Sequence, residues 1–251
     1  MPELGNYVEH GIHEIEGWMF PVDSELFAHL NDVVPPPGDL LEIGPFLGKS
    51  AIILGYLGGQ VEVADLFDTP LDDEAQIRER QTWYRSLTRQ KFEANWLRFH
   101  DELPVIHVGP SSELKADELG RRFRIVHIDG SHHYDDVRAD IALARAVTVD
   151  KSVVILDDIA SFHSPGVAAA GWEAVLRDGF VPAVFTSKLY GSWNGDVAMR
   201  LRELGHDVRG GATLTVVAGH DVVVPSRSAT SDTHASPLRR LARKVRSRSS
   251  R

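Results

Sequence analysis

Two apolar segments that end in acidic residues most constrain how this chain can fold. Residues 124–129 read RIVHID and end in Asp129. Residues 152–158 read SVVILDD and end in Asp157 and Asp158. A helix-patterned segment separates them, so we expect two parallel strands in one sheet. Because parallel strands end at the same edge of a sheet, this order predicts that the three carboxylates meet there.

The same alternation of strands and helices runs through most of the chain. Strand patterns are predicted at 39–43, 61–66, 105–108, 125–129, 153–156, 181–186 and 213–217, with a weaker one at 196–202. Helical patterns cover 23–34, 49–57, 71–100 and 168–177. This order predicts an α/β fold with a mostly parallel sheet and helices on both faces.

The chain divides into three parts by its patterns. We expect an N-terminal helical extension at 1–38, one domain at 39–224 and a basic tail at 225–251. The segment 71–100 is longer than a crossover between strands needs, so it is a predicted helical insertion and a candidate lid. Residues 1–38 and 71–100 also offer extra apolar helical surface, which predicts a homodimer.

Composition excludes several classes of protein. The 251 residues contain no cysteine, which excludes disulfides and thiolate-bound metals. No apolar run approaches the roughly 18 residues of a membrane span. The acidic N-terminus lacks the apolar core of a signal peptide. We therefore expect a cytoplasmic protein.

The charge is divided unevenly along the chain. Residues 225–251 hold eight basic side chains and one acidic one, a net charge of +7. The whole chain carries −9, so the rest carries −16. An acidic body argues against a nucleic-acid partner. The tail is predicted to be solvated and disordered, and contact with RNA, an acidic lipid surface or the body stays open.

Three aspartates at one sheet edge indicate a site for a hard divalent cation. Asp129, Asp157 and Asp158 offer the oxygen ligands that Mg²⁺ prefers. Each also has a simpler interpretation: Asp129 as the cap of a strand, and one of the pair as a structural acid.

Histidines surround this predicted metal site in the sequence. His132 and His133 follow Asp129 in GSHHYDD, and either can take a proton from a substrate. His163 follows the later strand, while His127 lies inside a strand and is expected to pack in the core. The residue spacing of a 2-His-1-carboxylate iron site is missing, which argues against an iron oxygenase.

A glycine turn points to a second ligand. Residues 41–50 read LEIGPFLGKS, where Gly44 and Gly48 allow a tight passage from strand to helix. The spacing is neither GxGxxG nor that of a P-loop. Asp65 ends the next predicted strand, VEVAD, where an acid can accept hydrogen bonds from both hydroxyls of a ribose. Turn and acid together predict a nucleoside-containing ligand.

On these segments the chain resembles the class I S-adenosylmethionine-dependent methyltransferases. The matching pieces are LLEIGPFLGKS, VEVADLF, VIHVGPSSEL, FRIVHIDGSHHYDDVRADI and VVILDDI, in the family's order. The tighter resemblance is to metal-dependent sugar O-methyltransferases that act on macrolide deoxysugars and other glycosides. The N-terminal IEGW at 15–18 resembles a segment of that group too.

The resemblance implies a Rossmann-like, seven-stranded sheet in the order 3-2-1-4-5-7-6, with the last strand antiparallel. S-adenosylmethionine would lie at its carboxyl edge. Implied contacts to the cofactor are Glu42, Gly44, Phe46, Gly48 and Ser50 at the methionine end, Asp65 at the ribose, Ser111 and Ser112 near the adenine, and Asp129.

The resemblance also implies the chemistry. Asp129, Asp157 and Asp158 would hold Mg²⁺, and His132 would be the base. Asp129 and His132 are therefore the implied catalytic residues. The implied reaction moves a methyl group to a sugar hydroxyl of a small molecule or an oligosaccharide, such as a mannoside. Candidate substrate contacts are Trp18, His133, Tyr134, His163 and Trp193.

Two other functions stay open at this point. A catechol or another phenol also chelates a metal through two oxygens, so a phenol O-methyltransferase is the closer alternative. A non-catalytic protein that binds a nucleoside cofactor, or RNA through its basic tail, is the second. Three converging acids are a poor surface for a phosphate backbone, which argues against the RNA version.

Overall fold

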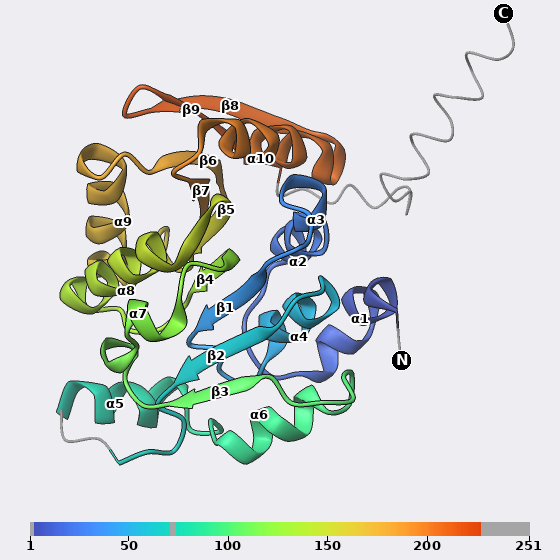
Figure 1. The fold of residues 1–251 in the computed structure, drawn as a ribbon, viewed down its shortest axis with the longest axis vertical. Helices are drawn as coiled ribbons and strands as arrows, with labels where there is room; N and C mark the ends of the chain where they lie inside the picture. Colours follow the sequence, from blue (N-terminus) through green and yellow to red (C-terminus); the bar gives the residue numbers. More distant parts are fainter. Residues whose placement is uncertain (1–2, 71–73, 227–251) are drawn as a thin grey trace, which may run out of the picture.

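The computed structural model describes residues 3–70 and 74–226. Within these residues, nine strands form one twisted sheet with helices on both faces (Figure 1). The order across the sheet is β3-β2-β1-β4-β5-β7-β6-β9-β8. The strands are β1 Asp39–Ile43, β2 Val61–Asp65, β3 Val105–Val108, β4 Phe123–Ile128, β5 Thr148–Leu156, β6 Val181–Phe185, β7 Leu189–Ser192, β8 Ala212–Val217 and β9 His220–Pro225.

The predicted strand order is confirmed for β1 to β7. The first five strands pair in parallel, and β7 runs antiparallel to both β5 and β6. In register, Ile43 lies opposite Ile128, and Ile128 lies opposite Leu156. The residues that follow these three strand ends therefore leave the sheet at one edge, which is the edge that the acids were predicted to share.

The C-terminal part of the sheet differs from the prediction. The weaker strand candidate at 196–202 is wrong, because these residues belong to helix α10, Gly195–Asp207. The Asn194 side chain caps this helix by accepting the N–H groups of Asp196 and Val197. The seventh strand is instead the four-residue β7, too short to show an apolar pattern. The predicted strand at 213–217 is β8, which pairs with β9 beyond β6 and makes the sheet two strands longer.

The helices form two layers. One layer holds α1 Leu4–Glu9, α2 Pro21–Ala28, α3 Leu30–Val33, α4 Lys49–Tyr56, α6 Arg89–Trp96 and α10. The other holds α7 Ala116–Leu119, α8 Tyr134–Val147 and α9 Pro165–Arg177, while α5 Glu74–Trp83 lies near the carboxyl edge (Figure 1). The helix predicted at 23–34 is divided at His29, and short 3₁₀ turns occupy Gly11–Glu14, Ser111–Glu113 and Val208–Gly210.

Each central strand contributes side chains to the cores on both faces of the sheet. Leu40 and Ile125 belong to the core cluster that includes residues of α2 and α4, whereas Leu41 and Val126 belong to the one that includes residues of α8 and α9. Strands buried on both faces read as continuous apolar runs, which is why they were visible in the sequence.

Buried Arg124 ties the N-terminal extension to the sheet. Its guanidinium donates to the backbone carbonyls of Val34 at 2.7 Å, Leu57 at 2.9 Å and Gly58 at 2.8 Å, and to the Asn31 side chain at 2.9 Å. A buried charge is tolerated where its donors are satisfied in this way. The helices before β1 are therefore part of the main core.

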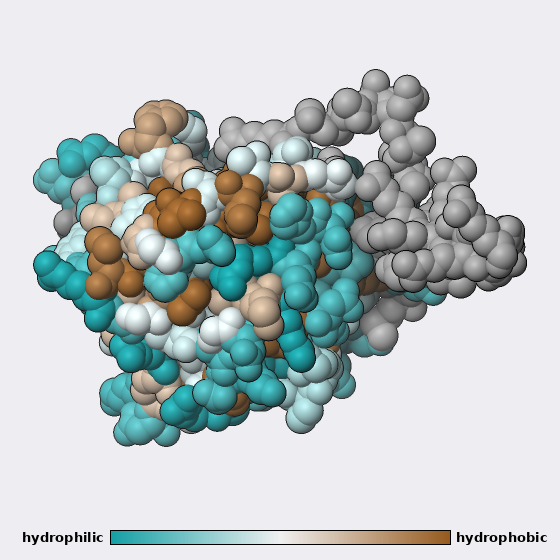
Figure 2. Space-filling view, turned by 90° about the horizontal axis from the view of Figure 1, so that it is seen from above, coloured by the Kyte–Doolittle hydropathy of each residue, from teal (hydrophilic) through white to brown (hydrophobic). Residues whose placement is uncertain are grey.

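Apolar side chains also lie at the surface. Figure 2 looks onto the end of the molecule with β8 and β9 and shows apolar groups among hydrophilic ones. Leu214 and Val216 of β8 are exposed there, and exposed Trp18, Phe20 and Trp83 lie in the two segments predicted to offer dimer surface. The homodimer stays a prediction. None of the described helices is long and apolar enough to cross a membrane.

Gly44 provides a test of this fold. Its φ is +81°, and a Cβ there would lie 2.0 Å from the carbonyl oxygen of Asp129. Gly58 has the same φ of +81° with nothing within 4 Å of its Cβ position. We expect Gly58→Ala to cost about 1 kcal/mol of the free energy of unfolding from backbone strain alone. Gly44→Ala should cost roughly 3 kcal/mol or more, since β1 and β4 must separate. Urea unfolding measures both, and equal losses would contradict the close approach.

Candidate active site

A small cavity opens where β4 and β5 end. It is lined by Ile128, Asp129, Gly130, Ser131, His132, Val137, Leu156, Asp157, Asp158 and Val167. The structure therefore brings the three predicted acids and His132 to one place. They arrive there because Asp129 follows β4 and the acid pair follows β5, two neighbouring parallel strands.

Asp158 faces two histidines. Its Oδ2 lies 3.1 Å from His132 Nε2 and 3.9 Å from His163 Nε2. The backbone of Asp158 has a φ of +54°, and its carbonyl accepts a 2.7 Å hydrogen bond from the Ser164 hydroxyl. Two histidines and one carboxylate, which showed no recognisable spacing in the sequence, thus come together from the loops after β4 and β5.

Asp157 turns away from these histidines. Its Oδ2 forms an ion pair with the ammonium of Lys188, and its Oδ1 accepts the N–H of Asp158 at 2.7 Å. Lys188 stands next to Leu189, the first residue of β7, which pairs with Leu156 at the end of β5. Antiparallel pairing therefore delivers this lysine to the acidic edge.

A buried polar row continues from Asp157 under the cavity. His127 Nε2 lies 3.8 Å from Asp157 Oδ2, and His127 Nδ1 lies 2.8 Å from Glu42 Oε1, which also accepts the Ser50 hydroxyl. Burial raises the pKa of Glu42 to about 7. Burial and the nearby Lys188 charge lower the pKa of His127 to about 3, so its ring is neutral. Among the described residues, Glu42 Oε2 and His127 Nε2 find no hydrogen-bond partner.

Asp129 lies between the two groups of charges. Burial raises its pKa to about 6, the carboxylates of Asp158 and Glu42 act in the same direction, and Lys188 opposes them. Within the described residues, two sets of ligand atoms lie within 4.8 Å of one another: His132 with Asp158 and His163, and His127 with Asp129 and Asp157. The Lys188 ammonium already pairs with the second set through Asp157.

The glycine turn lies beside this cavity. Gly44 follows β1, and its close approach to the Asp129 backbone brings the turn against the end of β4. Gly48, with a φ of +95°, precedes α4 and faces Phe92. Phe46 also has a positive φ, +49°. The two glycines therefore let the turn pack closely on the end of β4 and on Phe92.

The predicted nucleoside contacts lie on the other side of the turn. Asp65 accepts the N–H of Phe67 at 2.9 Å. Burial raises the pKa of Asp65 to about 6, although hydrogen bonds from the backbone of Phe67 and Phe46 lower it in part. The side chain of Ser111 forms a hydrogen bond with Asp140 of α8, and Ser112 is exposed. Asp140, which sequence reasoning missed, is nearly fully buried beside Gly130.

Aromatic rings line the approach to the site. Trp18 stacks on Phe46 with ring centroids 5.7 Å apart, and Tyr84 meets Phe46 edge-on at 5.6 Å. At the end of α5, Trp83 stacks on His163 at 6.3 Å. The neighbouring residues Trp83 and Tyr84 therefore connect the glycine turn with the histidine loop. A lid role for 71–100 stays a prediction, and residues 71–73 lie outside the described residues.

Two of the predicted substrate contacts are placed elsewhere. Trp193 packs on Phe180 at 5.1 Å, at the end of β7 far from Lys188, because β7 runs away from the acidic edge. The hydroxyl of Tyr134 bonds to Glu173 of α9, and His133 is exposed. The structure does not bring Trp193 or the Tyr134 hydroxyl to the cavity.

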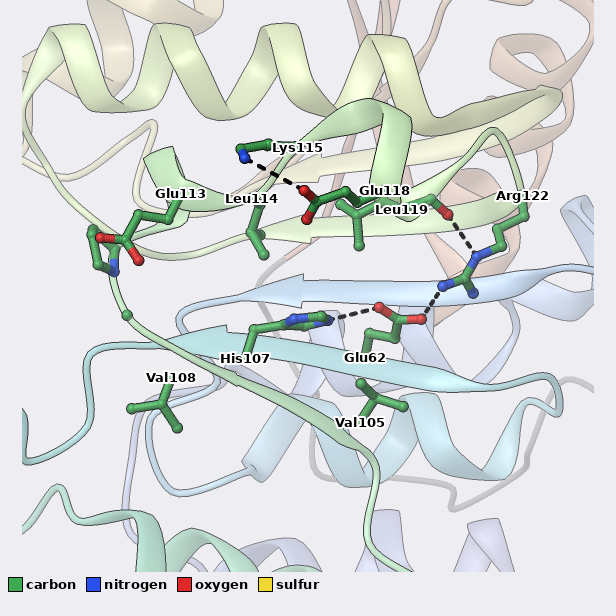
Figure 3. A pocket seen from close by; sticks show the side chains of 12 residues that line it. Glu62, Val105, His107, Val108, Glu113, Leu114, Lys115, Glu118, Leu119 and Arg122 are labelled. Atoms are coloured by element: carbon green, nitrogen blue, oxygen red, sulfur yellow. Dashed lines mark hydrogen bonds and ion pairs between the residues drawn. The ribbon is translucent and has the colours of Figure 1, made fainter.

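A second hollow, of about 440 Å³, lies beside β2 and β3 (Figure 3). His107 Nε2 and Glu62 Oε2 are 2.8 Å apart in it, and Arg122 pairs with Glu62 and Asp39. The described residues that line it include none of those predicted for the site. The candidate active site is therefore the cavity at the ends of β4 and β5, where the predicted residues meet.

Asp140 makes the electrostatics of this region testable. Burial raises its pKa to about 6, above the roughly 3.9 of an unfolded aspartate. The folded state therefore holds the proton more tightly, and this group lowers stability as pH rises from about 4 through 6. Asp140→Asn removes that loss, so we expect the variant to gain roughly 2 to 3 kcal/mol over the wild type between pH 4 and pH 7. Urea unfolding at both pH values measures it.

A companion variant sharpens this measurement. The Ser111 hydrogen bond lowers the pKa of Asp140. Ser111→Ala should therefore raise this pKa further and increase the loss in free energy of unfolding above pH 5. Parallel stability curves for the wild type and Asp140→Asn would contradict a buried, charged Asp140.

Known proteins support the class that this geometry suggests. Residues 41–159 match the family described as a methyltransferase domain. Among curated proteins, no sequence match is found. The fold is similar to that of the O-methyltransferase NovP, with 17% identity, a TM-score of 0.54, and coverage of 68% of this chain and 77% of NovP.

Two further solved structures share the fold. One is the SAH-bound methyltransferase PaMTH1 of Podospora anserina, with 10% identity, a TM-score of 0.51, and coverage of 77% and 89% of the two chains. The other is a candidate caffeoyl-CoA O-methyltransferase of Staphylococcus aureus, with 14% identity, a TM-score of 0.52, and coverage of 76% and 93%. Residues 41–159 therefore form a methyltransferase domain, in a chain with the fold that these O-methyltransferases share.

Proposed function

We propose that this methyltransferase transfers the methyl group of S-adenosylmethionine to a hydroxyl oxygen of a sugar, with a divalent cation at the acceptor. The observation that carries the proposal is the cavity where Asp129, Asp158 and His132 meet beside the glycine turn. Acceptors of the right class are mannosides and other glycosides, free or in an oligosaccharide.

The cofactor contacts remain those predicted. The turn at Gly44 and Gly48 would approach the methionine end, with Glu42, Phe46 and Ser50 around it. Asp65 would accept the ribose hydroxyls, and Ser111 and Ser112 would lie toward the adenine. Bound S-adenosylmethionine supplies a methyl group on a sulfonium centre. The SAH bound in the structure of PaMTH1 supports a cofactor of this type in the same fold.

The residues at the cavity suit Mg²⁺ with two protein ligands. Mg²⁺ keeps several waters and is commonly held by one or two carboxylates together with the substrate. Asp129 and Asp158 line the cavity and offer such oxygens. Asp157 stays a prediction as the third ligand, because Lys188 and the Asp158 backbone engage both of its oxygens. When bound, the cation would acidify the acceptor hydroxyl.

His132 is the proposed base. Transfer to oxygen requires the hydroxyl proton to leave, and an imidazole in reach can accept it. Asp158, 3.1 Å from His132 Nε2, can stabilise the imidazolium that results. Trp18 and Trp83 offer flat apolar surfaces on which one face of a sugar ring can stack, and His163 lies between Trp83 and Asp158.

A phenol acceptor is the second candidate. The fold of the candidate caffeoyl-CoA O-methyltransferase favours it, and two adjacent phenolic oxygens chelate a cation as a sugar diol does. The non-catalytic alternative is not favoured by the match to a methyltransferase domain. Binding of RNA was predicted for the basic tail at 225–251, of which residues 227–251 lie outside the described residues.

The function is tested by transfer of labelled methyl from S-adenosylmethionine to mannosides, deoxysugar glycosides and catechols, with Mg²⁺ and with EDTA. We expect labelled glycoside only when Mg²⁺ is present. If catechol alone is labelled, the acceptor is a phenol and not a sugar. Transfer that EDTA leaves unchanged would remove the cation from the proposal.

The base is tested by comparing His132→Ala with His133→Ala. We expect His132→Ala to lower kcat by about 10² to 10³ while the Kd for S-adenosylhomocysteine stays within about twofold. His133→Ala should have a far smaller effect on kcat, because its ring is exposed. A larger loss in His133→Ala would move the base to that residue.

A further inference from the structure

A buried lysine lies within the acidic edge. Lys188 is only 3% exposed, and its ammonium pairs with Asp157. A lysine is almost never buried without a partner, because removing its charge from water is costly. Sequence reasoning missed it, since a single lysine between Thr186-Ser187 and a short strand has no pattern.

Lys188 sits where a cation would bind. Ligand atoms of His127, Asp129 and Asp157 lie within 4.8 Å of one another, and the ammonium contacts the last of these. Asp157 Oδ1 is also engaged, by the N–H of Asp158. The Lys188 ammonium and the Asp158 N–H therefore satisfy Asp157 from two sides.

The turn that carries Lys188 is rigidly held. The Lys188 N–H donates to Thr186 Oγ1 at 3.0 Å, and Thr186 Oγ1 donates to Asp23 Oδ1 at 2.6 Å. The Tyr190 hydroxyl donates to the same Asp23 oxygen at 2.7 Å. Asp23 is fully buried in α2. The N-terminal extension thus fixes the turn between β6 and β7, and with it the position of the ammonium.

We propose that Lys188 is a positioning residue, a built-in cation that holds Asp157 and leaves Asp129 and Asp158 as the two carboxylates for the divalent ion. This inference rests on the cation dependence in the proposed function. A fixed positive charge beside the site weakens binding of a divalent ion by Coulomb repulsion. The site would then bind Mg²⁺ weakly until the substrate adds its own oxygens.

The first test removes the lysine charge. In Lys188→Met, the repulsion is gone and Asp157 is released as a third carboxylate. We expect Mg²⁺ to bind at least about tenfold more tightly than to the wild type, measured by isothermal titration calorimetry without substrate. Mg²⁺ should also raise the Tm of the variant more than that of the wild type, since it replaces the lost ion-pair partner.

The second test removes the pair together. The Lys188→Met/Asp157→Asn variant keeps the net charge of the site and leaves no buried ion unpaired, so it remains informative if the single variant does not fold. If the ion pair with Lys188 keeps Asp157 from binding the metal, the Kd of the double variant for Mg²⁺ should stay within about threefold of the wild-type value. A loss of about tenfold or more would make Asp157 a ligand and overturn the inference.

The same titrations separate this inference from the proposed function. Binding of Mg²⁺ to Lys188→Met but not to the wild type would support Lys188 as the built-in cation, and the comparison of Mg²⁺ with EDTA would then decide whether the reaction needs the divalent ion. An unchanged Kd in Lys188→Met would overturn the role of Lys188 and leave the cation-dependent reaction standing. No binding to any of the three proteins would overturn the role of Lys188, whereas methyl transfer unchanged by EDTA would overturn the cation-dependent reaction.

Discussion

A row of buried polar groups beneath the active edge is the constraint on which the rest of the site depends. It runs from Glu42 through His127 and Asp157 to Lys188, across β1, β4, β5 and the start of β7. In a low-dielectric core each of these groups is tolerable only beside its neighbours. The row therefore demands the strand order that is observed. It also places the Asp157 backbone, and with it Asp158, at the mouth of the cavity.

The N-terminal extension is a working part of this arrangement. Asp23 of α2 holds the turn that carries Lys188, and Arg124 binds the chain on both sides of β1 through the carbonyls of Val34 and Leu57. Trp18 in the same extension covers Phe46 of the glycine turn. The segment before β1 thus reaches the cofactor side, the acidic edge and the far end of the sheet, so its loss would disturb all three.

Much of the fold was predictable because the central strands are apolar on both faces and end in residues with special roles. β1, β2, β4 and β5 were located by these runs, and Gly44, Asp65, Asp129 and the Asp157-Asp158 pair by their position after them. The prediction failed where local pattern was weak or shared. The four-residue β7 carries too few side chains to show a period. The amphipathic pattern of residues 196–202 predicted a strand, although Asn194 caps a helix there.

The sequence by itself determined the alternation of strands and helices, the order of the acids at one edge and the methyltransferase resemblance, since each depends on residues close together in the chain. Only the tertiary structure decided which groups meet across that edge. His163 and His132 both lie beside Asp158, and Lys188 forms an ion pair with Asp157. Trp193 lies away from that edge because β7 runs antiparallel to β5. Such contacts join residues that are tens of positions apart. Strand order and direction set them, and no local spacing records either.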